Sequence, residues 1–125
     1  MAKKILVVED DENFAELVAG FLGTRGFEVA RAGDGEEALK SVALSKPDLV
    51  ILDIMLPKKH GYEVCERLRE RWSSKELPVL ALTSKAYPAD RNAAQTVGAD
   101  AFLTKPCSLV EVERVARQLL GEPQS

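Results

Sequence analysis

The sequence predicts an α/β domain: a doubly wound, five-stranded parallel sheet with helices on both faces. Short apolar runs alternate along the chain with segments whose apolar residues recur at helical spacing. The connections are short, and parallel strands joined in this way need right-handed crossovers that place helices against the sheet. A chain of 125 residues, 46% of them hydrophobic, is sufficient for one core.

The strands are expected where apolar runs are short and rich in β-branched residues. They are predicted at residues 4–9, 27–32, 49–53, 79–83 and 101–105. In the first of them, Ile5 to Val8 is apolar throughout, which is typical of a strand covered on both faces. In the second, Phe27 and Val29 alternate with charged residues, so this strand is placed at the sheet edge.

A helix is expected after each strand. The first shows apolar residues at i, i+3, i+4, i+7 and i+8, which predicts one buried stripe. Its members are Phe14, Leu17, Val18, Phe21 and Leu22. Further helices are predicted from residue 36, around 64–72, near 90–97 and after residue 108. Ser108 and Glu111 have the spacing of a capping box at the start of the last helix.

Composition excludes several classes of function. Charged residues make up 30% of the chain, the net charge is -3 and both signs are interspersed, so no nucleic-acid-binding stripe is expected. The apolar runs are strand-sized and no signal-peptide pattern opens the chain, which favours a cytoplasmic protein without membrane contact. Cys65 and Cys107 lack metal-ligand spacing and are interpreted as structural thiols.

Reactive side chains stand at the predicted strand ends. The first strand ends in Glu9 and Asp10, the third in Asp53, the fourth in Thr83 and the fifth in Lys105. Parallel strands end at one edge of the sheet, where ligands bind at the reversal of strand order. Carboxylates gathered there repel and need a cation, and Mg²⁺ suits an all-oxygen site with few carboxylates. Lys105 would supply a second compensating charge suited to a phosphoryl oxygen.

Three of these residues also have a simpler interpretation, whereas Asp53 is harder to dismiss because Leu49 to Leu52 should bury the strand leading to it. Asp10 is as well suited to cap the following helix as to bind a metal, although Asp11 or Glu12 could provide that cap instead. Taken alone, Thr83 indicates a local hydrogen bond and Lys105 a solvated surface lysine. The conjunction of four strand ends is far more specific than any one residue.

Four segments together resemble the receiver domain of two-component response regulators. They are ILVVEDD (5–11), PDLVILDIMLP (47–57), VLALTS (79–84) and GADAFLTKP (98–106). The resemblance extends from residue 4 to about residue 120. It implies a flavodoxin-like (βα)5 sandwich with strand order 2-1-3-4-5. Residues 1–120 are then expected to form the receiver domain, and residues 121–125 a C-terminal tail or the start of a linker.

The resemblance implies a role for each strand-end residue. Asp53 would be the phosphoacceptor, receiving a phosphoryl group from a sensor histidine kinase or a phosphotransfer protein. Glu9 and Asp10 would hold Mg²⁺ together with Asp53 and the backbone carbonyl of Met55, and Lys105 would pair with the phosphoryl group. Such a protein is a signalling domain that assists only its own phosphorylation and dephosphorylation, not an enzyme.

The resemblance also implies a switch. The Thr83 hydroxyl would move toward the new phosphoryl oxygens and Phe102 would turn inward, remodelling the face formed by the last two helices and the strand between them. That face would control a downstream effector protein or a fused output domain, and it is also a possible homodimer interface. A permanently buried Phe102 ring is the alternative. The Lys105–Pro106 bond is expected to be cis.

Some positions depart from the commonest family pattern. His60 stands where an acid is frequent, and Cys107 replaces a larger apolar residue in the loop that would face a kinase. Met55 and Lys85 occupy positions that tune the phosphoryl lifetime in the family.

Two competing hypotheses stay open at this point. A receiver-like interaction module that never uses phosphate would keep the acids only as caps. A flavodoxin-like enzyme, either a flavin binder or an aspartyl phosphatase, is less favoured. Four acids at 9–12 would repel a flavin phosphate, and Met55 stands where a phosphatase would need a second acid.

Overall fold

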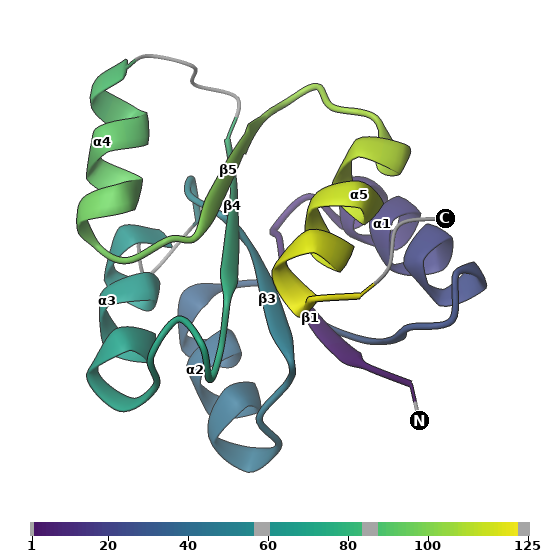
Figure 1. Ribbon diagram of the computed structural model, residues 1–125, viewed down its shortest axis with the longest axis horizontal. Helices are drawn as coiled ribbons and strands as arrows, with labels where there is room; N and C mark the ends of the chain where they lie inside the picture. Colours follow the sequence, from purple (N-terminus) through teal and green to yellow (C-terminus); the bar gives the residue numbers. More distant parts are fainter. Residues whose placement is uncertain (1, 57–60, 84–87, 123–125) are drawn as a thin grey trace.

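Parallel strands form the centre of the molecule in the computed structural model, which describes residues 2–56, 61–83 and 88–122 (Figure 1). They are β1 (Lys4–Val8), β2 (Glu28–Ala32), β3 (Leu49–Asp53), β4 (Val79–Thr83) and β5 (Ala101–Thr104). The sheet has the order β2-β1-β3-β4-β5, and every neighbouring pair is parallel. The five predicted strands, their order and the edge position of β2 are therefore confirmed, although Glu9, Phe27 and Lys105 were predicted as strand residues and lie just outside β1, β2 and β5.

Helices cover both faces of this sheet (Figure 1). One face carries α1 (Glu12–Thr24) and α5 (Leu109–Leu120). The other carries α2 (Gly35–Leu44), α3 (Gly61–Arg71) and α4 (Pro88–Thr96). The predicted doubly wound arrangement is confirmed, and each central strand has a hydrophobic layer on either side.

Alternation along β1 explains how one apolar strand supplies both layers. Ile5 and Val7 join the core beneath α1 and α5, whereas Leu6 and Val8 join the core beneath α2 and α3. All four side chains are at most 1% exposed. Full burial of such a side chain stabilises the fold by roughly 1.5–3 kcal/mol, so the central strands hold their carboxyl ends firmly in place.

Both helices on the first face begin at polar caps. The Asp11 carboxylate accepts from the backbone N–H groups of Asn13 and Phe14, at 3.0 and 3.3 Å. Asp11, not Asp10, therefore caps α1. Ser108 accepts from the Glu111 N–H at 3.0 Å, while both Glu111 carboxylate oxygens accept from Arg114. Of the two hydrogen bonds of the predicted capping box, the structure therefore contains the one to the Ser108 hydroxyl, while the Glu111 carboxylate binds Arg114 instead.

The predicted buried stripe of α1 was wrong for one residue, Leu17. Leu17 is 60% exposed, whereas Ala15, Val18 and Leu22 are the buried residues of α1. The buried stripe is therefore rotated toward Ala15, and Leu17 lies beyond its margin. Phe14 and Phe21 pack against the core from the edge of the stripe.

Candidate functional site

Three carboxylates meet at the carboxyl ends of neighbouring strands. Glu9 and Asp10 directly follow β1, and Asp53 is the last residue of β3. One oxygen from each lies within 4.8 Å of the others. Glu9 and Asp53 are only 4% and 6% exposed, while Asp10 is open to solvent. The structure brings together the acids that the sequence placed at one edge.

Burial of the Glu9 carboxylate makes its ionised form less favourable. Burial and, after it, nearby Asp53 together raise the pKa of Glu9 to about 7, despite the opposing effect of Lys105. One Glu9 oxygen also accepts from the Asp11 N–H at 3.2 Å. Two buried acids in contact favour a cationic partner, and Lys105 is one such partner in the described structure.

Lys105 reaches back over the sheet edge to both buried acids. Its Nζ donates to Asp53 Oδ2 at 3.0 Å and to Glu9 Oε1. Its burial disfavours the ammonium form, but the bonds to Glu9 and Asp53 outweigh that effect and raise the pKa of Lys105. The side chain is 19% exposed. Lys105 is therefore not the solvated surface lysine of the simpler interpretation.

The backbone after β3 orients the Asp53 carboxylate. The Met55 N–H donates to Asp53 Oδ1 at 2.8 Å, so each carboxylate oxygen has a different partner. The turn is tied to its neighbours because Ile54 donates to the Leu82 carbonyl at 2.9 Å and accepts from the Gly61 N–H at 3.1 Å. Asp53 is consequently presented in one orientation at the sheet edge.

Gly61 allows α3 to start close to this turn. A Cβ at position 61 would lie 2.6 Å from Ile54 Cα, 2.7 Å from the Asp53 carbonyl oxygen and 2.8 Å from the Ile54 carbonyl oxygen. These are backbone atoms that cannot rotate away. The glycine is required by close approach of two chain segments.

Gly61→Ala is therefore expected to destabilise the protein by about 1–3 kcal/mol, because the added methyl group forces the Asp53 turn and α3 apart. Chemical denaturation measures the change. Gly20→Ala is the matched control, since a Cβ at that helical position meets nothing within 4 Å. The control should stabilise the protein by about 0.5–1 kcal/mol. Equal effects of the two substitutions would contradict the steric argument.

Thr83 and the end of β5 complete the same edge. Thr83 is 1% exposed, and its carbonyl oxygen accepts from the Lys105 N–H at 2.7 Å. This bond holds the backbone of Lys105 beside β4. The Lys105–Pro106 peptide bond is cis, the isomer that the resemblance implies. His60 and Lys85 lie outside the described residues.

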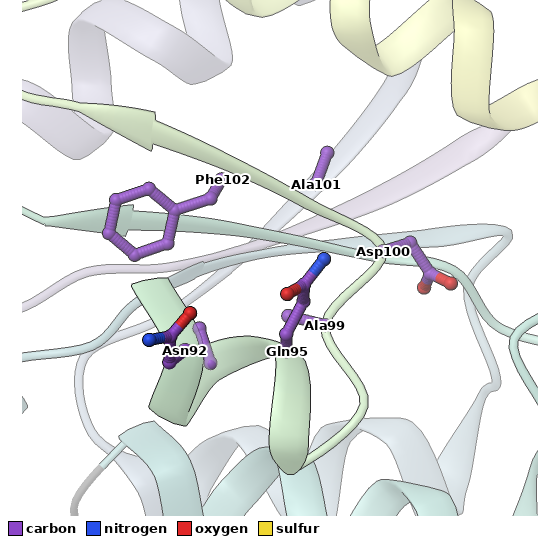
Figure 2. Close-up of a pocket in the computed structure, with 7 residues that line it drawn as sticks. Asn92, Gln95, Ala99, Asp100, Ala101 and Phe102 are labelled. Atoms are coloured by element: carbon purple, nitrogen blue, oxygen red, sulfur yellow. The ribbon is translucent and has the colours of Figure 1, made fainter. Parts of the chain in front are cut away.

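Phe102 lies on the β5 side that faces α4. It packs beside a cluster containing Ile54, Ala81 and Ala94 and is only partly buried. Figure 2 shows Asn92 and Gln95 of α4 pointing toward β5. Together with Phe102 they line a cavity of about 390 Å³. The ring thus has the core on one side and open space on the other.

The two cysteines are free thiols without an activating environment. Burial raises the pKa of Cys65 to about 11, and its Sγ donates to the Val97 carbonyl at 3.4 Å. Burial also raises the pKa of Cys107, against an opposing effect of Lys105. Both pKa shifts agree with the structural role expected from the sequence.

Among the described residues, no helix has the length and apolar character needed to cross a membrane.

Sequence reasoning missed one residue at this edge. Phe14 was predicted only as part of the core stripe, yet its ring centroid lies 4.5 Å from Lys105 Nζ. No local pattern could have indicated this contact, because the two residues meet only through the tertiary fold.

Comparisons with known proteins agree with this geometry. The family model described as the response regulator receiver domain matches residues 5–117. The chain is 44% identical over 120 residues to PhoP of Bacillus subtilis, the alkaline phosphatase synthesis transcriptional regulatory protein, covering 96% of this chain and 49% of PhoP. It is 41% identical over 120 residues to the response regulator MprA of Mycolicibacterium vanbaalenii, covering 96% of this chain and 51% of MprA. The chain spans about half the length of these curated relatives.

Solved structures agree with the family match. The BeF3-activated N-terminal receiver domain of Klebsiella pneumoniae RstA superposes with a TM-score of 0.87 at 34% identity, over 94% of this chain and 97% of that one. The receiver domain of a signal transduction histidine kinase from Syntrophus aciditrophicus gives a TM-score of 0.88 at 34% identity, over 96% and 91% of the two chains. From its fold, its strand-end residues and these matches, the chain belongs to the receiver domain family of two-component response regulators.

Proposed function

We propose that Asp53 accepts a phosphoryl group from a sensor histidine kinase or a phosphotransfer protein, in a reaction that depends on Mg²⁺. The observation that carries this proposal is the convergence of Glu9, Asp10 and Asp53 within 4.8 Å beneath the Lys105 ammonium. A carboxylate nucleophile held next to fixed positive charge is suited to forming an aspartyl phosphate.

The donor set fits Mg²⁺. Glu9, Asp10 and Asp53 offer carboxylate oxygens, the ligands that this ion prefers, and the exposed side of Asp10 leaves access from solvent. The Met55 carbonyl is the further ligand implied by the family resemblance, and the Met55 N–H already bonds Asp53. When bound, the ion would neutralise charge on the phosphoryl oxygens during transfer.

The chain's own groups would hold and orient the reacting carboxylate. The Met55 N–H fixes one Asp53 oxygen and Lys105 fixes the other. Once an incoming phosphoryl group brings its own oxygens, the Lys105 ammonium can transfer its hydrogen bond from Asp53 to one of them. The phosphodonor supplies the reactive bond, and the protein supplies position and charge.

Thr83 and Phe102 would couple phosphorylation of Asp53 to a conformational change in the α4–β5–α5 face. Thr83 ends β4 beside Lys105, and Phe102 lies on β5 between the core and the cavity against α4. A phosphoryl group on Asp53 would draw the Thr83 hydroxyl toward it and turn the ring inward. The α4–β5–α5 face would then change its affinity for a downstream effector, a fused output domain or a second copy of the chain.

The phosphoacceptor role of Asp53 also suggests the domain bounds and the class of protein. We assign residues 1–120 to the receiver domain and residues 121–125 to a tail or the beginning of a linker, in a cytoplasmic signalling protein that is not an enzyme. PhoP is named a transcriptional regulatory protein. We propose that in this chain any such output comes from a separate domain or partner, since the interspersed charges of the sequence predict no nucleic-acid-binding stripe.

Incubation with a small acyl phosphate tests the proposal without needing the natural kinase. With Mg²⁺ present, the intact mass of the protein is expected to increase by one phosphoryl group, and with a chelator it should not change. A protein that stays unmodified while a known receiver is phosphorylated would instead support the phosphate-independent interaction module.

Mg²⁺ is also expected to raise the melting temperature, because a ligand that binds only the folded state stabilises it. The gain is about 2.7 kcal/mol when the free ion is about a hundredfold above its Kd. Asp10→Ala should lose most of this gain. Thermal melting with and without Mg²⁺ measures both proteins.

Asp11→Ala is the matched control for that experiment. It removes the N-cap of α1, so it should lower stability by about 1 kcal/mol without the ion while keeping the shift that Mg²⁺ produces. Equal Mg²⁺-induced shifts in wild type and Asp10→Ala would remove Asp10 from the metal site.

A further inference from the structure

The Lys105 ammonium lies over an aromatic ring as well as against two carboxylates. Its Nζ is 4.5 Å from the centroid of the Phe14 ring, while it donates to Glu9 and Asp53. Phe14 belongs to the first turn of α1, directly after the Asp11 cap, and its N–H is one of the groups that Asp11 binds. The first turn of α1 therefore places the Phe14 ring close behind the Glu9–Asp10 segment and beside the lysine.

We propose that Phe14 is a positioning residue for Asp53 phosphorylation: its ring holds the Lys105 ammonium at the place where the phosphoryl oxygens will arrive. This role rests on the function proposed above. It acts through Lys105, since the ring itself touches no reacting atom.

A ring suits this task better than another acid would. Lysine carries its charge on a flexible four-carbon stem, so an ammonium without additional contacts occupies many positions. The face of an aromatic ring attracts a cation through its quadrupole, and the attraction is strongest when the pair is shielded from water. The Lys105 side chain is 19% exposed, which gives that shielding.

The ring also leaves the lysine's hydrogen bonds available. An ammonium has three N–H donors, and a carboxylate partner occupies a donor that a phosphoryl oxygen would need. Asp53 and Glu9 can exchange their bonds to Lys105 for a phosphoryl oxygen and a metal ion while the contact with Phe14 stays in place. The ring would thus keep the ammonium in position before and after transfer.

Phe21 is a control position that distinguishes placement of the Lys105 ammonium from packing of a ring in the core. It lies on the same helix, packs against the same core as Phe14, and also has a cation over its ring, the Arg25 guanidinium at 4.9 Å. Its cation, Arg25, pairs instead with Glu113 of α5 at 3.4 Å. Phe14→Leu and Phe21→Leu therefore remove equivalent rings, one beside the site and one at the far end of α1.

Phosphorylation kinetics with a small acyl phosphate and saturating Mg²⁺ test the proposal. Phe14→Leu is expected to slow Asp53 phosphorylation by about three- to tenfold, the range that a partly desolvated cation–π contact supports. Phe14→Tyr retains the ring face and should restore a rate close to wild type. Phe21→Leu should react at the wild-type rate, although both leucine variants lose some thermal stability.

A double-mutant cycle and a spectroscopic signal exclude an indirect effect. In a Lys105→Met background, Phe14→Leu should slow the reaction no further, because the group that the ring positions is already absent. In metal-free wild type, the Lys105 ε-methylene protons should show an upfield ring-current shift by NMR. That shift should disappear in Phe14→Leu and persist in Phe21→Leu.

The outcomes distinguish this role from the proposed function. A wild-type protein that takes up no phosphoryl group overturns the proposed function and this role with it. A phosphorylated wild type with equal rates in Phe14→Leu, or an equal loss of rate in Phe21→Leu, overturns the role of Phe14 alone. A Lys105 ε-methylene shift that does not respond to Phe14→Leu overturns it as well.

Discussion

Asp53→Asn is expected to abolish phosphorylation, with no phosphoryl mass gained at times when the wild-type protein is fully modified. The amide keeps the size and most of the packing of the carboxylate, but it lacks the anionic oxygen needed to attack phosphorus. Its neighbours would stay in place, because Asp53 is 6% exposed and enclosed by the turn after β3. Intact mass spectrometry after incubation with acyl phosphate and Mg²⁺ measures the result.

Asp34→Asn is the matched control for this prediction. Asp34 is another carboxylate near Glu9 and Asp10, and it caps α2 by accepting from the Glu37 N–H at 2.8 Å. Asparagine is an equally good cap, so this variant should fold normally and be phosphorylated at the wild-type rate. If Asp53→Asn still gained a phosphoryl group, the acceptor would be a different residue.

Lys105→Met is expected to slow phosphorylation by about a hundred- to a thousandfold, the usual cost of removing one preorganised charge from a transition state. Methionine keeps an apolar stem beside Phe14 but leaves Glu9 and Asp53 without this ammonium. Rapid-mixing or discontinuous phosphorylation assays give the rate. The variant should also be less stable without Mg²⁺, because two buried acids have lost a counter-charge.

Lys105→Met is also expected to change the stabilisation by Mg²⁺, and in the opposite direction to the phosphorylation rate. Mg²⁺ should stabilise Lys105→Met more than wild type, because the ion no longer competes with the ammonium for Glu9 and Asp53. Lys46→Met is a suitable control, since the Lys46 ammonium donates to the Pro47 carbonyl at 3.3 Å, away from the acids. A wild-type rate in Lys105→Met would show that phosphorylation does not use this lysine.

The sequence predicted the strand ends well because their signals are local. Short apolar runs ending in a polar residue define both a strand and the group it presents, as Leu49–Asp53 does. Parallel topology then brings those groups to one edge. The convergence of Glu9, Asp10 and Asp53 was therefore predictable from the sequence alone.

What the sequence could not supply depends on tertiary contact. The exposure of Leu17 reflects how α1 is rotated against the sheet, which helical spacing alone does not determine. The contact between Lys105 and Phe14 joins the end of β5 to the start of α1. The requirement for Gly61 follows from the backbone of the Asp53 turn, whose atoms would lie 2.6–2.8 Å from a Cβ at this first position of α3.

A crystal structure grown with Mg²⁺ and beryllium trifluoride, a mimic of a phosphoryl group, would test the central claim most directly. We expect one Mg²⁺ bound by Glu9, Asp10, Asp53 and the Met55 carbonyl, with the mimic on Asp53 and in contact with Lys105. A metal ion bound away from these carboxylates, or a mimic attached to another residue, would contradict the proposed phosphorylation site.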